Sequence, residues 1–238
     1  MSPGASFETA VDGTRRVLSY AGQRRTRKLL LASSGAVYGK QPADCERLSE
    51  DFPGSPPPAD ASTGYGQGKR AAEYLCSVAA ATTHLEVKLA RGFAFVGPLL
   101  PLDANFAIGN FIRDALQRDR IDVLGDGTAR RSYLYAADLA IWLWTILASG
   151  ESGRPYNVGS EEDISIADLA RLVAAVVRPD IPVRVAEPAI DGAPVARYIP
   201  STARAAEELG LKPSVMLDEA VSRTADWYQI GPMRRGAE

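Results

Sequence analysis

Tyr65 and Lys69 are the two residues whose types and spacing could do chemistry together. They stand four positions apart at the head of a predicted helix over residues 65–81, and positions i and i+4 share one face of a helix. An ammonium group near a phenol favours the phenolate and lowers the pKa of the phenol from its usual value of about 10. Such a tyrosine can exchange a proton with a substrate hydroxyl or carbonyl group. Taken alone, the two residues also fit an ordinary exposed helix start.

Two hydroxyl groups follow a predicted strand upstream of this helix. The stretch "LLLASSGAVYGK" (residues 29–40) begins as an apolar run, which is typical of a strand in a parallel sheet covered by helices. Ligands bind at the carboxyl ends of the strands in an open α/β sheet. The hydroxyl of Ser34 could therefore hydrogen-bond the same reacting oxygen as Tyr65. The alternative is that Ser33 and Ser34 have a capping or turn role.

Helical and extended patterns alternate along the chain, which predicts an α/β fold with a mainly parallel sheet. The stretch "LAIWLWTILA" (139–148) is too short to span a bilayer, which needs about 20 apolar residues, so we expect a buried helix there. Other predicted helices cover residues 7–21, 105–117, 136–149, 165–177, 201–210 and 216–228, and other predicted strands cover residues 85–97, 120–127, 154–160 and 181–188.

Composition excludes several classes of protein. The 238 residues suffice for one large or two small domains, and the net charge of −2 argues against nucleic acid or an anionic membrane as the main partner. Cys45 and Cys76 lack the spacing of a metal site, and the single histidine, His84, argues against Ser/His catalysis and a multi-histidine metal centre. Few cysteines and no signal-peptide pattern at the start predict a cytoplasmic protein that contains no metal site.

Six segments together resemble a known family, the extended short-chain dehydrogenases/reductases, and within it the NAD-dependent epimerase/dehydratase group that acts on nucleotide sugars. They occur in the family's order over nearly the whole chain. The segments are "SSGAVYG" (33–39), "YGQGK" (65–69), "RGFAFVGP" (91–98), "VLGDGTARRSYLYAADLA" (123–140), "YNVGS" (156–160) and "RYIPSTARAAEELG" (197–210).

The resemblance implies a Rossmann-type doubly wound parallel sheet with a small α/β substrate-binding domain. Residues 1–98 and 133–178 would form the NAD(P)-binding part, and residues 99–132 and 179–238 the domain that binds the nucleotide sugar. A homodimer would form through the helices at 7–21 and 65–81. Residues 7–21 resemble the family's mid-domain helix, and no glycine-rich GxxGxxG turn is present.

The missing glycine-rich turn leads to several expectations. We expect the N-terminal half of the sheet to be absent, NAD or NADP to bind weakly, activity to be impaired, and the strand "KLLLASS" (28–34) to present an unpaired edge. An incorrectly assigned start, a deliberately shortened chain and a split protein completed by another chain would each explain this.

The resemblance also implies roles at the site. Tyr65 would take a proton from a sugar hydroxyl while hydride passes to the nicotinamide. Lys69 would lower the pKa of Tyr65 and hold the nicotinamide ribose. Ser34 would bridge to the sugar oxygen, and Ser33 and Phe93 would line the cofactor site.

Three further residues match positions of the family. Arg131 and Arg197 would grip the diphosphate of a nucleotide-diphosphate sugar, because guanidinium groups suit phosphate oxygens. The alternative for both arginines is surface or interdomain ion pairing. Asp138 fits a structural hydrogen-bonding or capping role better than a catalytic one.

Three departures from the family's pattern narrow the reaction. Gly35 and Ala36 stand where family dehydratases carry Asp-Glu, and decarboxylating relatives tend to place Glu where Ala36 stands. Ala94 replaces a frequent Asn, which puts one polar contact to the substrate in doubt. Epimerisation is slightly preferred to 4-keto reduction, and both need only Ser, Tyr and Lys. The alternatives are a dTDP-glucose 4,6-dehydratase-like enzyme and a catalytically silent nucleotide-binding relative. The residues leave open the sugar, the base and the choice between NAD and NADP.

Overall fold

The computed structural model describes residues 2–230, which group into two compact units. These units divide the chain at other points than the predicted domains, because residues 162–178 join the second unit and residues 198–212 the first. The predicted substrate domain also extends into residues 231–238, which lie outside the described residues. Unit 1 comprises Met1–Phe93, Ala140–Glu161 and Tyr198–Lys212, and unit 2 comprises Ala94–Leu139, Glu162–Arg197 and Pro213–Glu238.

Unit 1 is built on a parallel sheet in the order β1-β2-β7. Its strands are β1 (Lys28–Ser34), β2 (Glu86–Gly92) and β7 (Pro155–Val158). In the pairing of β1 with β2, Lys28 lies opposite Glu86 and Ser34 lies opposite Gly92. The predicted parallel arrangement is confirmed, and Ser34 lies at the carboxyl end of β1.

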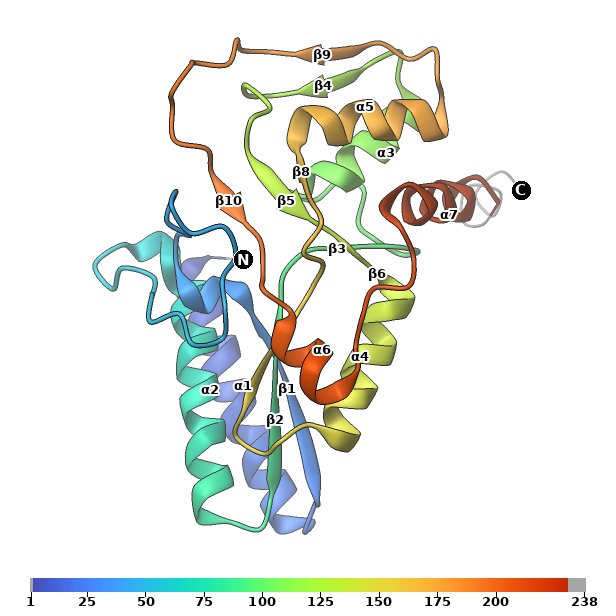
Figure 1. Cartoon of the computed structure of the whole chain (residues 1–238). Helices are drawn as coiled ribbons and strands as arrows, with labels where there is room; N and C mark the ends of the chain where they lie inside the picture. Colours follow the sequence, from blue (N-terminus) through green and yellow to red (C-terminus); the bar gives the residue numbers. More distant parts are fainter. Residues whose placement is uncertain (1, 231–238) are drawn as a thin grey trace. The chain divides into compact units, whose positions relative to one another are not determined.

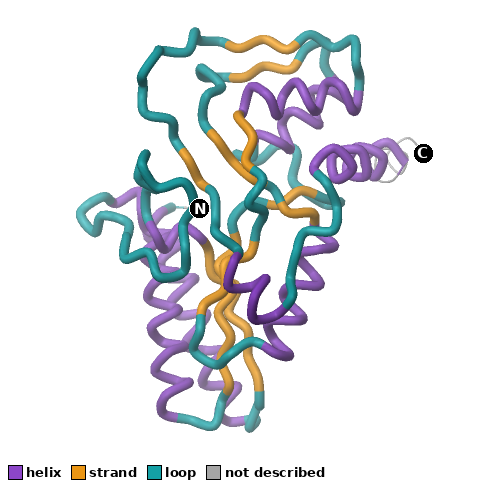
Figure 2. Tube along the Cα trace, in the orientation of Figure 1, coloured by secondary structure: helices purple, strands orange, loops and turns teal. Residues whose placement is uncertain are grey.

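Two long helices, α1 (Pro3–Gln23) and α2 (Gly64–Thr82), pack against each other on one side of this sheet (Figures 1 and 2). Gly68 allows their close approach, since a Cβ there would lie only 2.9 Å from the Cα of Phe7. Unit 1 also contains the 3-10 turns η1 (Gly35–Tyr38) and η2 (Ala61–Thr63), the helix α6 (Ala203–Leu209) and residues 140–149 of α4 (Ala136–Ser149).

Unit 2 consists of helices packed around short strands. Its buried core gathers apolar side chains from all three helices, among them Ile112, Leu169 and Val221. The helices are α3 (Ala107–Gln117), α5 (Ile166–Val177) and α7 (Leu217–Ile230). The strands form two parallel pairs, β3 (Phe95–Val96) with β6 (Leu134–Tyr135) and β4 (Ile121–Val123) with β9 (Val183–Val185). A further sheet has the order β10 (Arg197–Tyr198), β5 (Arg130–Ser132), β8 (Asp163–Ser165), and Tyr198 of β10 is the first residue of the last segment of unit 1.

The apolar stretch 139–148 corrects one prediction. It is helical, as expected, and Trp142 is 1% exposed, but Ile141 and Trp144 are 58% and 71% exposed. One face of α4 is thus buried and another carries large apolar side chains in contact with solvent. Within residues 2–230, no helix has the length and apolar character needed to cross a membrane.

Candidate active site

Ser34 has the capping role that its position after the strand suggested, and its role toward a substrate stays a prediction. It is buried, and its Oγ accepts a hydrogen bond of 3.2 Å from the backbone N–H of Ala36, which caps the turn η1. A hydroxyl group has one hydrogen to donate besides its accepting lone pairs. Within the described part of the chain, that hydrogen has no acceptor, so the capping role leaves Ser34 able to donate to a ligand.

Lys69 lies alongside Tyr65, as their spacing predicts. The Lys69 Nζ is 5.7 Å from the centroid of the Tyr65 ring, within the range of a cation–π contact. Tyr65 is 48% exposed at the first turn of α2, whereas Lys69 Nζ donates a hydrogen bond of 2.7 Å to the carbonyl oxygen of Ala32 on β1. Burial lowers the pKa of Lys69, and the negative charge of Glu73 opposes that shift.

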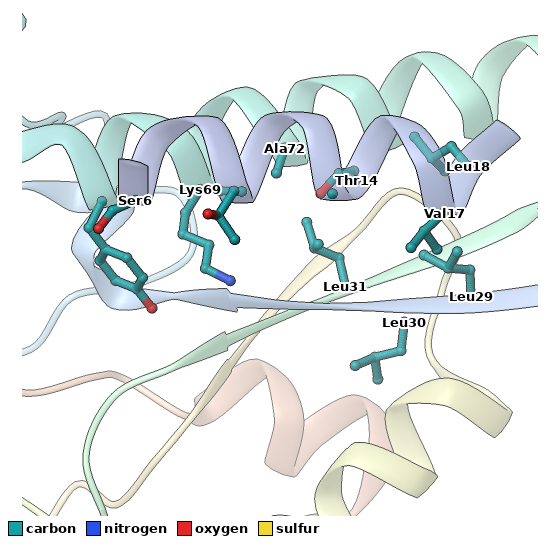
Figure 3. A pocket seen from close by; sticks show the side chains of 13 residues that line it. Ser6, Thr14, Val17, Leu18, Leu29, Leu30, Leu31, Lys69 and Ala72 are labelled. Carbon is teal, nitrogen blue, oxygen red and sulfur yellow. The ribbon is translucent and has the colours of Figure 1, made fainter. Parts of the chain in front are cut away.

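A groove of about 430 Å³ runs between α1 and β1 and reaches Tyr65 and Lys69. Figure 3 shows Leu29 and Leu31 on the side of β1 that faces α1, with the Lys69 side chain extending toward the same strand. Aliphatic side chains thus line most of the groove, and its polar groups are the Lys69 ammonium, the Tyr65 phenol and hydroxyl groups from α1. The lining residues from α1 include Ser6, Thr9, Ala10, Gly13 and Thr14.

Ser33 makes a contact that sequence reasoning missed. Its Oγ donates a hydrogen bond of 2.5 Å to Oε1 of Glu73, and both residues are 8% exposed. Glu73 also accepts two hydrogen bonds from Arg91, from Nε at 3.0 Å and from Nη2 at 2.7 Å. The hydroxyl hydrogen of Ser33 is therefore used inside unit 1, and the role of Ser33 toward a cofactor stays a prediction.

Phe93 and Tyr198 fill the space beside Gly35. Their ring centroids are 4.7 Å apart. A Cβ built on Gly35 would lie 2.6 Å from the Tyr198 hydroxyl oxygen and 2.8 Å from Cζ of Phe93. A side chain directly after Ser34 would therefore force these rings to move, and they stand where a longer side chain at residue 35 would have to go. Sequence analysis singled out Phe93 but not Tyr198.

The predicted phosphate-binding arginines belong to unit 2, whereas Ser33, Ser34, Tyr65, Lys69 and Phe93 belong to unit 1. Nη1 of Arg197 lies 3.4 Å from Oδ2 of Asp163. Asp163 also pairs with Arg130, and that hydrogen bond lowers the pKa of the Asp163 carboxyl group.

Arg131 differs from Arg197 in its partner. Its Nη1 donates to the carbonyl oxygen of Arg130 at 2.8 Å, and no carboxylate of the described residues pairs with it. Arg197 therefore forms an ion pair, which agrees with the alternative interpretation given above. Most guanidinium N–H groups of Arg131 remain available to another partner.

Asp138 has the structural role that we expected. Its Oδ2 accepts hydrogen bonds from the backbone N–H groups of Ser214 and Val215, at 3.0 and 3.2 Å, and its Oδ1 accepts one from the Ser214 hydroxyl at 2.5 Å. The carboxylate thus ties the first turn of α4 to the segment that precedes α7, within unit 2.

Comparison with known sequences connects this geometry to a family. The sequence pattern of the "NAD dependent epimerase/dehydratase family" matches residues 1–159. UDP-glucuronic acid decarboxylase 6 of Arabidopsis thaliana is 29% identical over 229 residues, which are 96% of this chain and 65% of that protein. UDP-glucuronic acid decarboxylase 1 of Xenopus tropicalis is 31% identical over 228 residues, which are 96% of this chain and 53% of that protein. The chain thus spans between about half and two thirds of these relatives' length.

Solved structures agree with this match. RMD from Pseudomonas aeruginosa, complexed with NADPH, superposes with a TM-score of 0.81 at 26% identity over 95% of this chain and 75% of that one. UDP-glucose 4-epimerase from Thermotoga maritima, with UDP-glucose, gives a TM-score of 0.82 at 21% identity over 99% of this chain and 72% of that one. The second likeness shows the α/β fold alone.

Proposed function

Because the chain belongs to the NAD-dependent epimerase/dehydratase family, we propose that it acts on a nucleotide-diphosphate sugar by NAD(P)-dependent hydride transfer. The observation that carries this proposal is the placement of the Lys69 ammonium 5.7 Å from the Tyr65 ring centroid, on a helix that borders the end of β1. The nicotinamide, when bound, supplies a hydride acceptor and donor. The protein's own residues have to move a proton and hold the sugar.

Tyr65 is the proposed proton-transfer residue. When the sugar carbon that bears a hydroxyl group is oxidised, the phenol oxygen of Tyr65 takes the proton of that hydroxyl. When a keto group is reduced, the same oxygen returns the proton. The ammonium of Lys69, 5.7 Å from the Tyr65 ring centroid, stabilises negative charge on the phenol oxygen during this transfer. Ser34 donates its uncommitted hydroxyl hydrogen to the same sugar oxygen and so stabilises the negative charge that develops there.

The residues of unit 1 fit one half of NAD(P). The Lys69 ammonium and the half-exposed Tyr65 hydroxyl suit the ribose hydroxyl groups next to the nicotinamide, and Phe93 offers an aromatic wall. The 238 residues contain no glycine-rich turn of the kind that cradles the cofactor diphosphate. We therefore propose that these residues by themselves hold NAD(P) weakly.

The proposed reaction is epimerisation or 4-keto reduction. Neither reaction needs a carboxylate after Ser34, and neither Gly35 nor Ala36 carries one. The same feature disfavours a 4,6-dehydratase. Decarboxylation is the second candidate, because the two relatives described above are named UDP-glucuronic acid decarboxylases. Ala36, in place of a glutamate, weighs against that reaction.

Two partner assignments belong to the same proposal. Arg131, which lacks a carboxylate partner in the described residues, would bind the diphosphate of the nucleotide sugar. A homodimer would bring together α1 and α2 of two copies. Exposed apolar side chains on these helices, including Tyr20 at 59% and Val78 at 42%, support this arrangement.

The test is a panel of nucleotide sugars with NAD or NADPH at saturating concentration, followed by NMR and mass spectrometry. Epimerisation conserves the mass of the substrate, reduction adds two hydrogens, and decarboxylation releases carbon dioxide. We expect Tyr65→Phe to lower the rate by about 100-fold or more. Tyr74→Phe, on an exposed face of the same helix, is the matched control and should retain full activity.

Two results would contradict the proposal. Full turnover by Tyr65→Phe would remove Tyr65 from the chemistry. Binding of nucleotide sugars without turnover, at cofactor concentrations that saturate the chain, would instead favour the catalytically silent alternative. Isothermal titration measures cofactor binding separately, and micromolar affinity for NAD would contradict the proposed weak binding.

A further inference from the structure

Glu73 is a buried carboxylate that connects three elements of unit 1. It lies on α2, one turn after Lys69, and is 8% exposed. Its Oε1 accepts hydrogen bonds from Oγ of Ser33 on β1 at 2.5 Å and from Nε of Arg91 on β2 at 3.0 Å. Its Oε2 accepts a hydrogen bond of 2.7 Å from Nη2 of Arg91. One carboxylate thus ties the helix to two neighbouring strands.

Lys69 and Glu73 together fix α2 on β1 at two points. Residues four apart share one face of a helix, and here both face the same strand. Lys69 Nζ bonds the carbonyl oxygen of Ala32, and Glu73 bonds the hydroxyl of Ser33, the next residue along β1. Ser34 follows immediately. A shift of α2 along β1 would break both contacts, so the two bonds set the register between Tyr65 and Ser34.

Arg91 extends the connection to the other side of Ser34. Its Nη1 donates to Oη of Tyr38 at 2.9 Å, and its guanidinium carbon lies 4.9 Å from the centroid of the Tyr38 ring. Tyr38 is the last residue of η1, the turn that Ser34 caps. The segment that carries Ser34 is therefore held through Ser33 before it and through Tyr38 after it, and both contacts lead to Glu73.

Stability alone does not account for a charged pair at this place. Replacing a buried ion pair by apolar side chains is often neutral or stabilising, because removing charges from water is costly. The bidentate geometry does fix direction and distance, since the two donors of a guanidinium group match the two oxygens of a carboxylate.

We propose that Glu73 is a positioning residue, which holds α2 in register on β1 so that Tyr65 and Lys69 stand at the strand end that carries Ser34. This inference rests on the proposed function for its catalytic meaning. Its structural content concerns unit 1 alone. The charged and titratable groups that face Glu73 are Arg91 from β2, Tyr38 from η1, and Lys69 and Cys76 from α2.

The test compares Glu73→Gln with a matched control. Glutamine keeps the shape of the side chain and one accepting oxygen but removes the charge. Asp114→Asn is the control, because Asp114 is also buried and pairs with an arginine, Arg113, at 2.8 Å, but belongs to α3 of unit 2. The two readouts are hydrogen exchange of the α2 amides and the titration of Lys69 followed by NMR of its ¹³C-methylated amine, assigned with Lys69→Arg.

We expect Glu73→Gln to accelerate hydrogen exchange in residues 64–72 at least ten times more than in α3. We also expect it to lower the pKa of Lys69, because the negative charge of Glu73 raises that pKa. Asp114→Asn should leave both unchanged. If Glu73→Gln instead accelerates exchange equally in α2 and α3 and leaves the Lys69 titration unmoved, Glu73 is an ordinary structural ion pair and the inference is wrong.

A second variant guards against a folding failure. Ser33→Ala removes only one of the hydrogen bonds to Glu73, and we expect a smaller local acceleration in the same residues 64–72. Unchanged exchange in Ser33→Ala would also overturn the inference. None of these readouts needs substrate or cofactor. Local effects as expected, without turnover by the unmodified chain, would therefore contradict the proposed function and leave the positioning role of Glu73 in place.

Discussion

At the scale of single residues, the packing around Gly35 limits which side chain can follow Ser34. A side chain there would meet the Tyr198 hydroxyl and the Phe93 ring at 2.6 and 2.8 Å. We expect Gly35→Ala to lower the free energy of unfolding by about 1–3 kcal/mol, because overpacking a filled site forces its neighbours to move. Gly22→Ala is the control. No atom lies within 4 Å of a Cβ at Gly22, and alanine is a better helix former. Urea unfolding measures the stability of both variants. An unchanged stability of Gly35→Ala would show that the rings of Phe93 and Tyr198 can move aside.

Tyr38 predicts how stability depends on pH. Burial raises the pKa of Tyr38 to about 12 from 10.0, although Arg91 acts in the opposite direction. A raised pKa in the folded state means that Tyr38 stabilises the fold fully below pH 10 and loses this contribution as the pH rises toward 12, by about 1.4 kcal/mol per unit. The stability difference between the unmodified chain and Tyr38→Phe should therefore narrow above pH 10 in urea unfolding. A difference that stays constant up to pH 11 would contradict this.

Residues that act locally were predictable, and residues that act through distant partners were not. The approach of Lys69 to Tyr65 follows from a spacing of four on one helix. Glu73 also lies four residues after Lys69, but its partners Ser33 and Arg91 are 40 and 18 positions away in the chain. No local pattern states which of two strands a buried carboxylate will bind. Tyr198 escaped notice for the same reason, since its neighbour Gly35 comes from the other end of the sequence.

At the scale of elements, the length of a helix or strand decided whether the sequence pattern predicted it. The helices of ten or more residues repeat an apolar face several times, and the structure places all of them close to the predicted ranges. The strands β5, β6, β8 and β10 have two or three residues each, too few for a period to emerge. The antiparallel pairing of Arg131 with Ile164 depends on where unit 2 brings the two segments together.

Asp138 gives a prediction at this scale, because it links two elements of unit 2. Its carboxylate accepts three hydrogen bonds from Ser214 and Val215. We expect Asp138→Ala to lower the free energy of unfolding by about 1–3 kcal/mol, since it removes three hydrogen bonds to a buried carboxylate and leaves two part-buried backbone N–H groups without that acceptor. Asp12→Ala, which removes an exposed pair with Arg15, should change it by less than about 0.5 kcal/mol. Equal losses in the two variants would show that the link between α4 and α7 is unimportant.

At the scale of the whole molecule, the free edge of β1 is the feature with the widest consequence. Among the described residues β1 pairs only with β2, which agrees with the unpaired edge that we expected from the missing glycine-rich turn. An edge strand presents a row of unpaired N–H and C=O groups that can pair with another chain. This strand has no proline, and its one charged residue, Lys28, stands at its start. Its leucines border the groove along α1, where they remain partly exposed.

We therefore expect the 238-residue chain to associate through this edge beyond a dimer as its concentration rises. A dimer through α1 and α2 would saturate at two copies, whereas edge pairing combined with it continues to larger species. Leu30→Lys should suppress the larger species, because a charge on an edge strand opposes the approach of a second strand. Leu124→Lys is the control, since Leu124 is 86% exposed in unit 2 and away from this edge. Sedimentation velocity separates the species. Unaltered association of a folded Leu30→Lys variant would mean that β1 is not the surface through which copies meet.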